Sequence, residues 1–168
     1  ESGAIRQALA SEIALLDPAP PSDAPEAARG FIVSREGLAA WMNPLHPEQL
    51  LSLSGIRMRF QDGTEAKCDE ACRGARQIFW SADGKKLYAL QKSSWFDNRT
   101  TLLQWTVGDP APVQIPFNDN EMIGCVMSGK ELICALENAR TPRRLVAIDP
   151  DTGLDRLIYD PNPDFRNI

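Results

Sequence analysis

Four cysteines are the residues of this chain whose type and spacing point most directly to chemistry. Cys125 and Cys134 flank a short turn that contains Gly129 and Lys130. If those two residues form a two-residue hairpin loop, Cys125 faces Cys134 in a non-hydrogen-bonded pair, with Cα atoms about 4.5 Å apart. That distance suits a disulfide, and glycine at the first loop position suits a type II′ turn. We therefore predict a disulfide across this hairpin.

A different turn would change this pairing. A loop at Ser128 and Gly129 shifts the register by one residue and places Cys125 opposite Leu132. The two cysteines would then be buried free thiols, which pack like small apolar side chains.

Cys68 and Cys72 are separated by three residues, and their role has three alternatives. A disulfide would close a small loop and stiffen a connection between blades. Free thiols are the second alternative, and a metal or redox site is the third. A metal site needs two more ligands, and thioredoxin-like redox sites use Cys-x-x-Cys beside a βαβ unit. Four cysteines in so small a domain favour an oxidising compartment, so we expect a periplasmic or secreted protein.

The chain offers little catalytic machinery. It has no Gly-x-Ser-x-Gly elbow, no His-Glu-x-x-His motif and no glycine-rich phosphate loop. The only histidine, His46, lies between two prolines, where an exposed turn is expected. The oxygen-rich run 118–121 lacks the glycine and glutamate spacing of an EF-hand. We expect this chain alone to be non-catalytic, with no metal site and no cofactor.

Trp95 and Phe96 lie in a segment, 92–99, that joins two expected strands. Loops held by a rigid scaffold often carry binding residues, and aromatic side chains are enriched at interface hot spots. The pair is therefore a candidate contact for a peptide or another domain. The alternative is that one ring folds back and caps the core of its own blade.

The elements that position these residues are indicated by a loose internal repeat. Each of the stretches 31–41, 78–90 and 124–136 is an apolar strand, a turn with Ser and Gly, and a second apolar strand. The turn glycines lie 47 and then 45 residues apart, a period typical of propeller blades with four strands each. A closed propeller needs about four to eight blades. The sequence therefore predicts an all-β fold, an open partial β-propeller of about three blades.

The repeat also indicates the domain boundaries. Residues 4–16 carry apolar side chains at helical spacing, and a Pro/Ala linker comes next. We expect residues 1–29 to form a short helix and linker, and residues 30–168 to form the propeller segment. Residues 66–75 are polar and are expected to connect two blades.

The composition of the chain excludes some classes of partner. With 43% hydrophobic residues in 18.6 kDa, the chain can bury a core. A net charge of -5 and a pI near 4.9 argue against a nucleic-acid partner. No run of about 18 apolar residues occurs, so we expect no membrane span.

Three stretches carry a resemblance to known proteins. The sequence IFWSADGKKLYAL (78–90) is similar to the blade signature of propellers in the prolyl oligopeptidase-like (S9) serine peptidases and in the TolB-like group. The stretches 30–41 and 157–165 resemble the lasso-peptide isopeptidases, a branch of that S9 family. The resemblance covers residues 30–168 and suggests the N-terminal propeller portion of such an enzyme.

That resemblance implies a periplasmic serine hydrolase that cleaves the isopeptide bond of a lasso peptide. Its propeller would cover a C-terminal α/β-hydrolase domain and restrict which peptide substrates reach the nucleophile. The family's catalytic serine, aspartate and histidine would all lie beyond Ile168, so no catalytic residue is assigned here. The partners implied are that hydrolase domain and the peptide. The alternative is a freestanding TolB-like periplasmic binding or scaffold propeller.

Overall fold

The computed structural model describes residues 24–92, 99–117, 121–138 and 140–164. These residues form twelve strands in three four-stranded antiparallel sheets and contain no α-helix. The prediction of an all-β chain with three four-stranded blades is confirmed. The helix expected at 4–16 lies outside the described residues.

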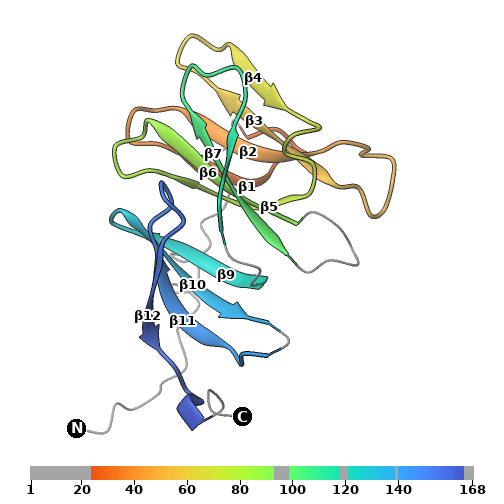
Figure 1. The fold of residues 1–168 in the computed structure, drawn as a ribbon. Helices are drawn as coiled ribbons and strands as arrows, with labels where there is room; N and C mark the ends of the chain where they lie inside the picture. The colour runs from red at the N-terminus through yellow and green to blue at the C-terminus, as the bar shows by residue number, and fades with distance from the viewer. Residues whose placement is uncertain (1–23, 93–98, 118–120, 139, 165–168) are drawn as a thin grey trace, which may run out of the picture.

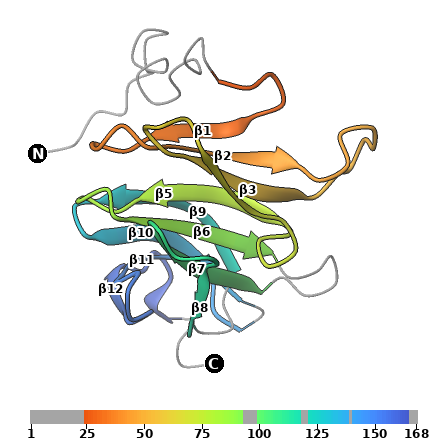
Figure 2. The same cartoon turned by 90° about the horizontal axis from the view of Figure 1, so that it is seen from above.

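Each sheet pairs its strands in chain order, as a propeller blade does. The first blade consists of β1 (Arg29–Val33), β2 (Ala39–Pro44), β3 (Ser54–Arg59) and β4 (Glu65–Cys68). The second consists of β5 (Ala75–Trp80), β6 (Lys86–Lys92), β7 (Thr100–Thr106) and β8 (Val113–Ile115). The third consists of β9 (Glu121–Ser128), β10 (Glu131–Glu137), β11 (Arg144–Ile148) and β12 (Asp155–Tyr159). The blades follow one another as stacked layers (Figures 1 and 2).

The connection between the first two blades is shorter than the polar run 66–75 suggested. Its first residues belong to β4, which pairs with β3 through Met58 and Ala66 and through Ile56 and Cys68. Such an edge strand needs apolar residues only at alternate positions, so the intervening lysine hid it in the sequence. The true connection is 69–74.

The second blade is apolar on both faces. Along β6, Leu87 and Ala89 face the first blade, whereas Tyr88 and Leu90 face the third. Strand β7 alternates in the same way. Two separate cores result, one on each side of the second blade, so this blade is the central layer of the molecule.

The molecule has two opposite edges, or rims. We call the edge with the turns 34–38, 81–85 and 129–130 the turn rim, because each of these turns joins the first two strands of a blade. We call the opposite edge, with the loop 45–53 and the connection 69–74, the connection rim.

Asp151 fastens the third blade to the second at the turn rim. Its Oδ1 accepts hydrogen bonds from Lys86 Nζ at 2.8 Å, Tyr88 Oη at 2.6 Å and Gln104 Nε2 at 2.7 Å. Partial burial alone would raise the pKa of the Asp151 carboxyl, but the hydrogen bonds and the charge of Lys86 outweigh it and leave that pKa lowered. Burial, together with the neighbouring carboxylate, raises the pKa of the Tyr88 phenol. Asp151 is therefore held as an ionised acceptor.

Gly153 allows the same turn to approach the second blade closely. Its φ is +74°, and a Cβ atom there would lie 2.0 Å from the carbonyl oxygen of Pro116. No side chain fits without moving one of the two backbones, so glycine is required at this seam.

The first prediction concerns this seam. Gly153→Ala should lower the free energy of unfolding by at least about 2 kcal/mol, because left-handed strain adds to a backbone clash. Gly108→Ala is the matched control, because Gly108 has φ +95° and a methyl group on its Cα would meet no other atom within 4 Å. It should cost only about 1 kcal/mol. Denaturant unfolding measures both, and equal losses would contradict the close approach.

The second prediction concerns Asp151. A carboxyl whose pKa is lowered on folding stabilises the fold above its unfolded pKa, and this contribution is lost as the pH falls through its folded pKa. Asp151→Asn should therefore melt at a lower temperature than the parent at pH 7. The difference should shrink below about pH 4. Melting curves from pH 3 to 8 provide the test, and a difference independent of pH would show that the charge of Asp151 contributes nothing.

Candidate functional site

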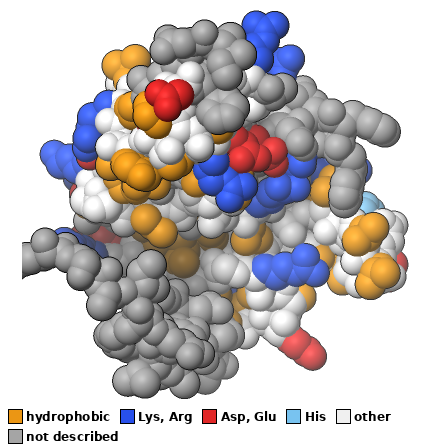
Figure 3. Space-filling view, turned by 90° about the horizontal axis from the view of Figure 1, so that it is seen from below, with side chains coloured by type: hydrophobic (Ala, Val, Ile, Leu, Met, Phe, Trp, Pro, Cys, Tyr) orange, Lys and Arg blue, Asp and Glu red, His pale blue; other side chains and the backbone are white. Residues whose placement is uncertain are grey.

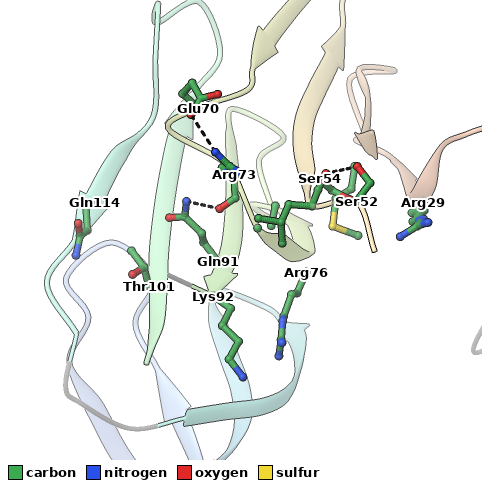
Figure 4. Close-up of a pocket in the computed structure, with 14 residues that line it drawn as sticks. Arg29, Ser52, Ser54, Glu70, Arg73, Arg76, Gln91, Lys92, Thr101 and Gln114 are labelled. Carbon is green, nitrogen blue, oxygen red and sulfur yellow. Dashed lines mark hydrogen bonds and ion pairs between the residues drawn. The ribbon is translucent and has the colours of Figure 1, made fainter. Parts of the chain in front are cut away.

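A cavity of about 640 Å³ lies on the connection rim between the first and second blades (Figure 4). Strands β1, β2 and β3 supply one side of it, and β5, β6 and the connection 69–74 supply the other. Its lining is mainly polar and basic, with Arg29, Arg73, Arg76, Lys92, Ser52, Ser54, Gln91, Thr101 and Gln114 among the residues.

The charge of this cavity is opposite to that of the whole chain. Four basic residues line it against one acidic residue, Glu70, although the chain carries a net charge of -5. A second cavity, of about 540 Å³, lies on the turn rim between the second and third blades. Two lysines line that one against four carboxylates. The two rims therefore present opposite fields, and the connection rim is the one suited to an anionic ligand.

The backbone of Gly74 joins the two blades beside the cavity. Its N–H donates to the carbonyl of Ser54 at 2.9 Å, and its carbonyl accepts from the N–H of Lys92 at 3.1 Å. The side-chain amide of Gln91 donates to the carbonyls of Ala71 and Arg73, at 3.1 and 2.9 Å. These bonds hold the connection 69–74 as a fixed wall of the cavity.

A disulfide between Cys68 and Cys72 closes the same wall, with Cα atoms 5.4 Å apart. Both residues are buried in the core between the first two blades. Of the three alternatives left open by the sequence, the structure has the disulfide.

The second disulfide joins Cys125 and Cys134 in the core between the second and third blades. Ser128 pairs with Glu131, and Cys125 pairs with Cys134 at a Cα distance of 4.2 Å, as expected for the loop Gly129–Lys130. Gly129 has φ +62° and Lys130 does not have a positive φ, which makes the turn type II′. Neither disulfide offers a free thiol for chemistry.

Irregularities in the first strands of two blades adjoin two arginines that line the cavity. In β5 the register shifts at Arg76, and in β1 it shifts just after Arg29. A bulge re-aims side chains and is often found next to functional sites. Arg29 and Arg76 lie 47 residues apart, and each comes five residues before the serine that begins the first turn of its blade. In the third blade, the residue five before the corresponding serine is Ile123, which is bulged. Extending the repeat backwards from the serines would have found these arginines in the sequence.

None of the other candidate residues that the structure describes is among the lining of this cavity. Trp95 and Phe96 lie outside the described residues, as do residues 118–120 of the oxygen-rich run. Its last residue, Glu121, begins β9 and has its Oε1 3.9 Å from Lys92 Nζ. His46 lies in the loop 45–53 with its side chain exposed, and its Nδ1 is 3.5 Å from Glu48 Oε1. Among the described residues, no cluster of three or more His, Cys, Asp or Glu side chains could hold a metal, and no helix could cross a membrane.

Comparison with known proteins gives one close parallel. No family model matches the chain. The lasso peptide isopeptidase AtxE2 of Asticcacaulis excentricus is 31% identical over 167 residues, which cover 98% of this chain. Over almost its whole length the chain is similar to this lasso peptide isopeptidase. It spans only 23% of the length of that relative.

Solved structures agree with this relationship. The apo structure of AtxE2 covers 98% of this chain with a TM-score of 0.71 and 29% identity. An AtxE2 variant with Astexin3-dC4 bound aligns with the same TM-score. TolB from Acinetobacter baumannii aligns over 79% of the chain with a TM-score of 0.57 and 12% identity, which shows the fold alone. The chain thus has the blade arrangement found in both proteins.

The third prediction concerns the cavity wall. Replacing Cys68 and Cys72 together by Ser should lower the free energy of unfolding by about 2 kcal/mol, as expected for so small a closed loop. It should also speed trypsin cleavage after Arg73, whose side chain is 53% exposed, because the connection 69–74 loses its covalent clamp.

The double replacement of Cys125 and Cys134 by Ser is the control. It should cost similar stability, about 2 to 3 kcal/mol, without changing cleavage after Arg73. Mass spectrometry of timed digests distinguishes the two variants. Equal cleavage rates in both would show that the first disulfide does not hold the wall.

Proposed function

We propose that this chain forms the first blades of the propeller of a longer, prolyl oligopeptidase-like (S9) serine hydrolase that opens the isopeptide bond of lasso peptides. The observation that carries the proposal is the similarity to AtxE2, which extends over 98% of the chain at 31% identity. The role of the chain in that enzyme is non-catalytic. It gates the active site of a C-terminal α/β-hydrolase domain and contacts the peptide substrate.

The open outer face of the third blade supports a longer parent protein. On the face of the third blade turned away from the second, Val126 and Tyr159 are each 62% exposed, and Ile123 and Leu145 are partly exposed. Figure 3, seen from the side of this blade, shows hydrophobic side chains on the surface with basic ones beside them. An apolar sheet face of this kind is normally covered, and further blades are its natural cover.

The outer face of the first blade buries its large aromatic side chain more completely than that of the third blade. Trp41 is only 2% exposed there, Phe31 stacks on it at 5.8 Å, and the guanidinium of Arg59 lies 4.9 Å from its ring centre. A cation over an indole ring adds to such packing. The third blade therefore has the greater need of a partner.

Two disulfides in one small segment support an exported protein. We place the parent enzyme in the periplasm or outside the cell. In this compartment both disulfides persist and can stabilise a segment with few layers.

A freestanding periplasmic scaffold of the TolB kind is the second candidate, because the fold shared with TolB does not by itself require a hydrolase domain. The two candidates differ in the region downstream of the propeller. The isopeptidase requires a hydrolase domain with a nucleophilic serine there, whereas the scaffold requires only further blades.

The fourth prediction tests the main proposal. The full-length protein should linearise a threaded lasso peptide, and serine-directed fluorophosphonate should abolish the reaction. Residues 1–168 expressed alone should give no turnover, and His46→Ala should leave the full-length rate unchanged. Product mass, which rises by one water, reports the cleavage. Turnover by residues 1–168 alone, or a full-length protein inert toward lasso peptides, would contradict the proposal.

A further inference from the structure

We infer that Arg29 and Arg76 bind carboxylate groups of an acidic peptide in the connection-rim cavity. The inference rests on the proposed function, because it names the chemistry by which the propeller recognises the peptide. The two arginines come from different blades, β1 and β5, and line the same cavity (Figure 4).

Neither guanidinium has an ion-pair partner within the described part of the chain. Other arginines are matched with carboxylates: Arg57 with Asp69, Arg59 with Glu65, Arg143 with Glu137 and Arg156 with Glu131. In the cavity itself, Arg73 lies 3.9 Å from Glu70. Arg29 and Arg76 are thus the cavity cations left for a ligand.

The cavity prefers a carboxylate to a neutral group for electrostatic reasons. A guanidinium presents paired N–H donors that match the two oxygens of a carboxylate, and such bonds are stronger than neutral ones. The single acidic residue of the lining, Glu70, is already close to Arg73. An entering anion therefore meets unmatched positive charge, whereas an entering cation meets repulsion.

Neutral donors also line the cavity. Thr101 and Gln114 contribute a hydroxyl and an amide group to the wall, whereas the hydroxyl of Ser52 already donates to the carbonyl of Leu53. The amide of Gln91 is committed to two backbone carbonyls, so it holds the wall and does not take part in recognition. Charge at two points, with neutral donors elsewhere in the same cavity (Figure 4), suits an extended acidic peptide.

The size and shape of the cavity favour a peptide over a docked domain. Its volume of about 640 Å³ lies in the range typical of ligand sites, roughly 300 to 1,000 Å³. A domain interface usually buries a broad surface of about 800 Å² on each partner and does not need a hollow. A few peptide side chains fill such a hollow, with the carboxylate at the arginines.

A bulge in β5 aims Arg76, whereas Arg29 is paired with Met42 and lies just before the irregularity of β1. The corresponding bulge residue of the third blade is Ile123, so the cationic position is restricted to the two blades that enclose the cavity. The change of residue type follows the position of the cavity.

The test measures peptide binding to the full-length protein by fluorescence anisotropy. Three labelled pentapeptides are compared: Gly-Glu-Gly-Glu-Gly amide, Gly-Gln-Gly-Gln-Gly with a free C-terminus, and Gly-Gln-Gly-Gln-Gly amide. The variants are Arg29→Gln and Arg76→Gln. Lys130→Gln, which removes the same charge from the turn-rim cavity, is the matched control.

At least one charged peptide should bind about tenfold more tightly than the neutral amide, since a hydrogen-bonded charge pair is worth roughly that factor. Each arginine variant should lose about tenfold of this preference, Lys130→Gln should lose none, and added salt should weaken it in the parent protein. The peptide that shows the preference identifies the source, a glutamate side chain or the C-terminal carboxylate. Equal affinity for all three peptides, or an equal loss in Lys130→Gln, would overturn the inference.

Two further outcomes distinguish a peptide site from a domain contact and from the proposed function. If Arg76→Gln leaves peptide affinity unchanged but makes the full-length protein easier to digest between domains, the cavity faces another domain and the inference fails. Isopeptide cleavage is measured on the same variants. A preference for carboxylate peptides without isopeptide cleavage would support the binding site and contradict the proposed function. Cleavage without that preference would support the proposed function and contradict the binding site.

Discussion

Burial of apolar side chains on both faces of the second blade is the interaction on which the rest of this structure depends. A four-stranded sheet must cover its apolar faces with another layer. Here the second blade covers one face of the first and one face of the third, and the two cores lie on either side of it. Because β6 alternates apolar residues toward both neighbours, neither outer blade can separate without exposing half of the central one.

The polar and covalent contacts act within this frame. Each disulfide lies in one of the two cores, and each seam has a glycine where two backbones come too close for a side chain. Gly74 serves the seam beside the basic cavity, and Gly153 serves the seam beside Asp151. Apolar burial supplies the attraction, whereas the glycines and Asp151 determine how the blades are aligned. That alignment in turn brings Arg29 and Arg76, which are far apart in the chain, to the same cavity.

Local geometry made one disulfide and the blade repeat predictable from the sequence. The hairpin at Gly129 has a two-residue loop, and the alternation of pairs along a hairpin places Cys125 opposite Cys134 without any knowledge of the rest of the fold. The repeat of strand, turn and strand likewise predicted the blades. The strand 65–68 was partly missed, because an edge strand with one buried face has too few apolar residues to stand out from a polar connection.

The sequence by itself determined the blade period and the resemblance to the isopeptidases and narrowed the hairpin at Gly129 to two registers, because each depends on residues close together in the chain. Tertiary structure alone decided where the basic cavity lies and which charges meet there. Arg29 and Arg76 are separated by 47 residues, and only the packing of one blade on the next brings them to a common surface. The Asp151 contacts, which span 47 to 65 residues, have the same origin. Pairings across sheets depend on the summed packing of two faces, and no short stretch of sequence contains that information.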